Sequence, residues 1–167
     1  MNRSIRTALA LTLALSPALA PVAQAQAQVM PKFYVYGEDD TPADMRACKV
    51  THAAAIAVVQ SELRGAGIVI QTDSKDPEAV MDTYINITAM PIPSASASCT
   101  YNFELSYESY NEVPNPFTSA NEFTKLTYCN KGSLMVWDKA TAQTAINDKL
   151  REYVRECLTK YKGRNSR

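Results

Sequence analysis

The hydrophobic and polar positions alternate most regularly over Cys99–Tyr107, where every second residue is apolar or aromatic. The residues between them are Thr, Asn, Glu and Ser, so one side of this stretch is polar. A period of two predicts a β-strand with one face on a core and the other in solvent. Weaker patterns predict further strands at Ile68–Thr72, Tyr84–Met90 and Glu122–Asn130, the last continuing over Leu134–Trp137 after a bulge or turn at Lys131–Ser133.

Two other segments repeat their apolar residues every three or four positions, which predicts helices. The first has Thr41 as its N-cap and Pro42 at its first position, and it ends at Gly65. The second starts near Asp138 or Thr141 and ends at Gly163, a residue suited to the position after a helix. The predicted buried stripes are Met45, Cys48, His52, Ile56, Val59 and Leu63 in the first helix, and Ile146, Leu150, Tyr153, Val154, Cys157, Leu158 and Tyr161 in the second.

This order of elements predicts an α+β fold, a two-layer sandwich in which an antiparallel sheet of about four strands carries two helices on one face. Residues 41–163 form one domain in this interpretation. Residues 28–40 are expected to be an extended N-terminal arm or a short edge strand, and residues 164–167 a frayed tail. The longest irregular connection is expected at residues 111–121, which contain Pro114 and Pro116.

The first 27 residues have the layout of a cleaved signal peptide. Arg3 and Arg6 precede an apolar run at residues 8–15, and small residues lead to an A-x-A site at Ala23–Ala27. This run is shorter than the roughly 20 residues that span a bilayer, and no other stretch could cross one. The sequence therefore predicts a periplasmic or secreted protein, in a bacterial style of export.

Charge narrows the range of partners. The chain has 17 basic and 17 acidic residues, and loss of Arg3 and Arg6 leaves a net charge of −2. Nucleic-acid-binding domains are usually basic, so this charge argues against a nucleic-acid partner. A protein or an envelope component is the expected partner.

Four cysteines in an exported chain predict two disulfides. In an up-and-down meander, the start of the first helix and the end of the second lie at the same level, which favours Cys48–Cys157. A hairpin centred on Pro114 favours Cys99–Cys129. A metal site is the alternative, although metal-binding cysteines usually occur in close pairs.

The chemistry-bearing residues give no catalytic motif, and no cofactor or metal is predicted. The single histidine, His52, follows Cys48 by one helical turn. The pair could serve as a metal site or as a thiolate with its base, but a histidine at the core edge beside a cystine is the favoured interpretation. The sequence lacks a G-x-S-x-G nucleophile motif and a phosphate-binding glycine loop.

Two groups of side chains are the remaining candidate sites. The carboxylates Asp73, Asp76, Glu78 and Asp82 suggest a solvated turn or, alternatively, a small exported hydrolase or ligand carrier. The aromatic residues Tyr107, Tyr110 and Phe117 suggest strand packing or a binding face. The leading hypothesis is a non-enzymatic accessory protein that binds a partner through a sheet edge or the 111–121 loop.

Overall fold

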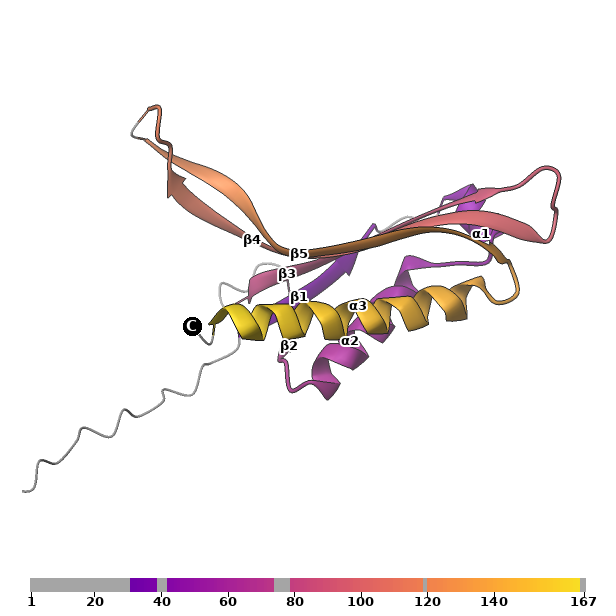
Figure 1. Ribbon diagram of the computed structural model, residues 1–167, viewed down its shortest axis with the longest axis horizontal. Helices are drawn as coiled ribbons and strands as arrows, with labels where there is room; N and C mark the ends of the chain where they lie inside the picture. The colour runs from indigo at the N-terminus through magenta and orange to yellow at the C-terminus, as the bar shows by residue number, and fades with distance from the viewer. Residues whose placement is uncertain (1–30, 39–41, 74–78, 119, 166–167) are drawn as a thin grey trace, which may run out of the picture.

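A twisted sheet covered on one face by helices organises the chain (Figure 1). The computed structural model describes residues 31–38, 42–73, 79–118 and 120–165, so the predicted signal peptide lies outside the described residues. The elements are β1 Lys32–Gly37, α1 Ala43–Ala47, α2 His52–Gly65, β2 Ile70–Gln71, β3 Ala79–Pro91, β4 Ser98–Pro114, β5 Asn121–Asp138 and α3 Ala142–Asn165. The predicted α+β class is confirmed.

The arrangement of strands differs from the predicted meander. In the described residues the sheet has five strands in the order β2-β1-β3-β4-β5, and β1 runs parallel to both of its neighbours. The segment expected to be an arm or an edge strand therefore lies inside the sheet. It does so because Phe33 and Val35 are buried in the core, and α1 and α2 supply the crossover that parallel strands require.

The first predicted helix is broken in two. Lys49 has a positive φ of 59° and ends α1, and the Thr51 hydroxyl then accepts a hydrogen bond from Ala54 N to cap α2. Between them Val50 is fully buried. A continuous helix would turn Val50 away from the stripe that contains Cys48, so the break allows both side chains to enter the core.

The core lies between the sheet and the helices α2 and α3, which run side by side below it in Figure 1. The strand with the clearest alternation, β4, contributes Tyr101, Phe103, Leu105 and Tyr107 to this core, all fully buried. The helix α3 extends to Asn165, past the glycine where the sequence predicted its end. Among the described helices, none is long and apolar enough to cross a membrane.

The hairpin of β4 and β5 is longer than the sequence predicted. Pro114 pairs with Asn121, so both ends of the expected 111–121 loop are strand and the connection between the strands is shorter than predicted. Asn115 makes the turn compact, since its side-chain oxygen accepts hydrogen bonds from Phe117 N (2.7 Å) and Thr118 N (3.3 Å). Lys131–Ser133 is ordinary strand, and the irregularity lies instead between Tyr107 and Glu108 and their partners on β5.

The two disulfides join Cys48 to Cys99 and Cys129 to Cys157, so the predicted pairing was wrong. Its error follows from the hairpin. Because the strands turn later than Pro114, Cys99 lies opposite Trp137 and Cys129 lies opposite Tyr107. Each disulfide instead joins the sheet to the helical layer. Two disulfides are compatible with an oxidising, exported location.

Candidate functional site

Tyrosines gather on the face of the sheet that the helices leave uncovered, here called the open face. Tyr34 and Tyr36 of β1 alternate with the core residues Phe33 and Val35, so their rings lie on this side. The Tyr34 and Tyr36 rings stack with centroids 5.6 Å apart, and Tyr36 contacts Tyr84 of β3 at 5.2 Å. Three phenol side chains thus form a continuous surface across β1 and β3.

This surface continues onto the hairpin. Tyr110 of β4 lies close enough to Tyr36 to help raise the pKa of its phenol, and the Tyr110 ring stacks on Phe123 of β5 with centroids 5.7 Å apart. The five rings of Tyr34, Tyr36, Tyr84, Tyr110 and Phe123 are called the aromatic band below. The band crosses four strands, and rings with an apolar body and a polar tip are typical of binding surfaces.

Two carboxylates lie at the centre of the band. Asp82 of β3 is the direct cross-strand partner of Glu108 of β4. Glu108 is only 4% exposed and accepts hydrogen bonds from Ser106 Oγ (2.6 Å) and Lys125 Nζ (3.1 Å). Burial, and then the negative charge of Glu108, raises the pKa of Asp82. The carboxylates therefore lie opposite each other, and Lys125 pairs with Glu108.

Two phenols of the band, those of Tyr36 and Tyr84, remain protonated well above neutral pH because their pKa values are raised. A hydrogen bond from Tyr84 Oη to Glu38 Oε1 (2.6 Å), and then burial, raises the pKa of Tyr84 to about 12. Burial, followed by the nearby Tyr110, Asp82 and Glu108, raises the pKa of Tyr36. At neutral pH Tyr36 and Tyr84 therefore offer neutral hydroxyl groups close to the side chains of Asp82 and Glu108.

Substitution Asp82→Asn is expected to raise the melting temperature at neutral pH. Because the pKa of Asp82 is raised on folding, ionisation of this carboxyl favours the unfolded chain, and the isosteric amide removes that cost. At pH 3, below the unfolded pKa of about 3.9, the Asp82 carboxyl is largely protonated in both the folded and the unfolded chain, so the gain should largely disappear there. Thermal unfolding followed by circular dichroism from pH 3 to pH 8 measures this. The control is Glu112→Gln on the exposed hairpin, and an equal gain at both ends of the pH range would contradict the prediction.

Beyond Asp82 and Glu108, the hairpin leaves the rest of the sheet and carries two rings of the aromatic band, Tyr110 and Phe123, with it. The described pairing of β3 with β4 ends at Asp82 and Glu108, and from there β4 and β5 pair only with each other. Residues 109–126 are called the hairpin arm. Figure 1 shows it rising from the sheet on the side away from α2 and α3. Phe117 at its tip is 95% exposed and Phe123 is 72% exposed.

The structure separates the three predicted binding residues. Tyr107 is in the core, where its ring packs edge-on against Phe33 and its hydroxyl donates to Val154 O (3.5 Å). The hypothesis of a binding role for Tyr107 is therefore wrong, because its position in the alternation points it at the helices. Tyr110 lies at the base of the hairpin arm and Phe117 at its tip.

The predicted carboxylate group is only partly within the described residues. Asp76 and Glu78 lie outside them, and Asp73 follows β2. Asp82 belongs to the open face, where its neighbour is Glu108, a residue that the sequence did not single out. The tyrosines of β1 and β3 were also missed, although their alternation at positions 34 and 36 was a usable signal.

His52 has a structural role in the fold. It is buried, and its Nε2 accepts a hydrogen bond from Ile87 N (3.2 Å) of β3. Since β1 ends at Gly37 opposite Ile85, the imidazole satisfies a strand amide beyond the end of the neighbouring strand. Cys48 is held in a disulfide and supplies no thiolate, and the described residues contain no cluster of three or more metal-ligating side chains.

The chain matches no protein-family model, and no curated protein matches it either. The open face and the hairpin arm are therefore the features that bear on its function.

Proposed function

We propose that this protein is an exported, non-enzymatic binding protein that engages a partner protein through its hairpin arm and the adjoining aromatic band. The observation that carries the proposal is the exposure of Phe117 and Phe123 on a two-stranded arm that extends beyond β3. Large apolar side chains on an extended, otherwise uncovered element are characteristic of interaction sites.

The arm is suited to binding because its exposed aromatic residues are held in place. Phe123 stacks on Tyr110, and the turn that presents Phe117 is closed by Asn115. Aromatic anchors that are fixed before binding lose little conformational freedom when a partner covers them. Such anchors commonly contribute most of the free energy of an interface.

The aromatic band would extend the contact at the base of the arm. The Tyr36 and Tyr84 hydroxyls stay neutral at physiological pH because the pKa values of both are raised, and the carboxyl side chains of Asp82 and Glu108 lie beside them. Apolar rings combined with a polar, charged rim are the composition expected of a protein interface. Oxidised cysteines and the predicted signal peptide support placing this partner in the periplasm or outside the cell.

The proposal is tested with a photo-crosslinking amino acid introduced at single positions in the cell of origin. We expect crosslinks to the same protein from positions 117 and 123, and none from Val69, which is also exposed (58%) but lies beside β2. With that protein purified, Phe117→Ala should weaken binding about 30-fold, the effect of losing about 2 kcal/mol at an anchor. Equal crosslinking from all three positions, or unchanged affinity, would refute a role for the arm.

A further inference from the structure

The outer edge of β5 is the longest unpaired strand edge among the described residues. β5 has 18 residues and is last in the strand order, whereas β2 at the opposite edge has two. Lys139 N donates to Ala97 O (2.9 Å), so odd-numbered residues near the end of β5 direct their backbone groups to β4. The backbone groups of Gly132, Leu134, Val136 and Asp138 therefore point outward.

The side chains along this edge offer no protection against pairing. From Gly132 to Trp137 the strand contains neither a charge nor a proline. Leu134 is 69% exposed and Val136 is 60% exposed on the open face. Proteins usually guard open edges with charges, prolines or bulges, and an uncharged apolar edge is a template for strand addition.

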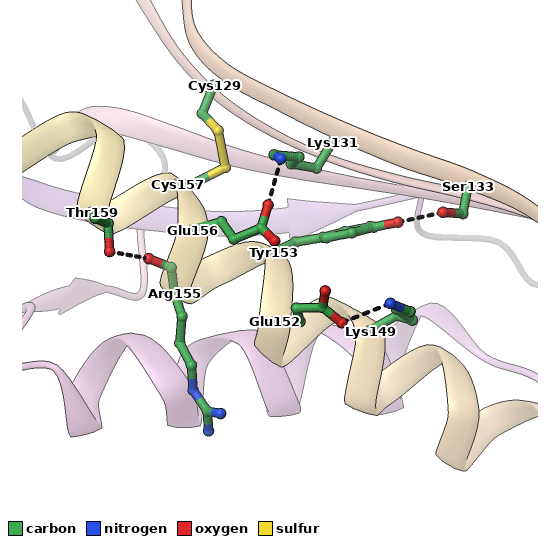
Figure 2. Close-up of polar contacts among 10 residues, drawn as sticks. All are labelled: Cys129, Lys131, Ser133, Lys149, Glu152, Tyr153, Arg155, Glu156, Cys157 and Thr159. Carbon is green, nitrogen blue, oxygen red and sulfur yellow. Dashed lines mark hydrogen bonds and ion pairs between the residues drawn. A yellow bond between two sulfur atoms is a disulfide. The ribbon is translucent and has the colours of Figure 1, made fainter.

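The other side of the strand is already fixed to α3, as Figure 2 shows. Cys129 is bonded to Cys157, Lys131 pairs with Glu156, and Ser133 shares a hydrogen bond with Tyr153. These contacts hold β5 against α3 from the helical side, while β5 is the last strand of the sheet and its open-face side chains Leu134 and Val136 stay exposed. An incoming strand would thus meet a preformed edge.

We propose that two copies of this chain associate through these edges, with residues 132–138 of β5 pairing antiparallel about Met135. In this register each Leu134 lies opposite Val136 of the second copy, and the outward backbone groups of both residues face each other. Leu134 and Val136 of the second copy therefore form a hydrogen-bonded pair. Met135 lies opposite Met135 of the second copy in a non-hydrogen-bonded pair. A two-fold axis through Met135 makes the contact self-complementary.

A second copy fits this edge because one register satisfies both the backbone and the side chains. Even-numbered residues of one copy lie opposite even-numbered residues of the other. Both open faces therefore lie on one side of the joined sheet and both helical layers on the other. The two sheets then form one continuous sheet. The two-fold axis places each exposed Leu134 beside Val136 of the other copy, so the contact contains this apolar pair twice. This association is separate from the proposed function, since it leaves the hairpin arm and Phe117 free.

Sedimentation equilibrium of the purified protein over a concentration series tests the association. We expect a reversible dimer for the wild-type chain and a monomer for Val136→Lys, because the lysine would place like charges at the contact. The matched control is Met90→Lys, which introduces the same charge at an exposed apolar position of β3, away from the edge; it should still dimerise. A wild-type chain that stays monomeric at every concentration would overturn the proposal.

A cysteine test decides the register. Met135→Cys should form an intermolecular disulfide under mild oxidation, because non-hydrogen-bonded partners have Cα atoms about 4.5 Å apart, within disulfide range. Val136→Cys should not form one, since position 136 of the second copy is a diagonal neighbour, about 7–8 Å away. Equal crosslinking of both variants, or of neither, would exclude this pairing. Phe117→Ala should leave the dimer intact, so a failure here is distinguishable from a failure of the arm.

Discussion

Phe103→Ala is expected to lower the free energy of unfolding by about 3–5 kcal/mol, the cost of truncating a large core side chain. Phe103 is fully buried on β4, and its ring lies 5.7 Å from Trp137 of β5 and 6.0 Å from Tyr153 of α3. These three rings connect the two longest strands to the C-terminal helix. Removing the central one leaves a cavity that neither neighbour can fill without losing its own contacts.

Phe123→Ala provides the matched control, because it removes the same side chain from the exposed end of the same hairpin. Phe123 touches Tyr110 and is mostly in solvent, so its loss should change stability by about 0.5 kcal/mol or less. Urea unfolding followed by tryptophan fluorescence measures both variants. Similar losses at the two positions would mean that the hairpin arm contributes to the core, contrary to its exposure.

The β4 strand could be predicted because the pattern that defines it lies within a single stretch of nine residues. Alternation over Cys99–Tyr107 is enough to assign a strand and its buried face, and both are as predicted. The position of β1 depends instead on pairing with residues of β2 and β3 far along the chain. The residues of β1, which include three aromatic residues and a glycine, do not indicate which strands it pairs with. Residues 28–40 were therefore interpreted as an arm or an edge strand.

The candidate site was hard to predict for the same reason. The aromatic band draws its rings from four strands, and each ring is unremarkable in its own segment. Asp82 and Glu108 become neighbours only through the register of β3 and β4. The turn prolines led to a loop at 111–121, whereas Pro114 is the last residue of β4, where the missing amide costs little. The exposure of Phe117 could be expected from the sequence, because an aromatic residue in a turn is exposed whatever the register of the neighbouring strands.

The largest covalent effect is expected from removing the Cys48–Cys99 disulfide. Cys48→Ala with Cys99→Ala should cost about 4 kcal/mol in the chain-entropy account, given a sequence separation of 51 residues. The bond lies next to the break between α1 and α2, and the carbonyl of Cys48 accepts a hydrogen bond from Tyr101 Oη (3.0 Å). Loss of the disulfide should therefore loosen the connection between this break and β4. Unfolding in urea without reductant measures the change.

The same variant tests the pairing itself. If Cys129 is bonded to Cys157, the double substitution leaves that disulfide intact, and a thiol assay on the denatured protein should find no free cysteine. If the pairing were Cys48–Cys157 and Cys99–Cys129, the double substitution would instead remove one partner of each disulfide and leave Cys157 and Cys129 as free thiols. Removing Cys129 and Cys157 together should cost slightly less, about 3.5 kcal/mol, because that bond closes a separation of 28 residues. Two free thiols in the first variant would refute the observed connectivity and, with it, the placement of β5 on α3.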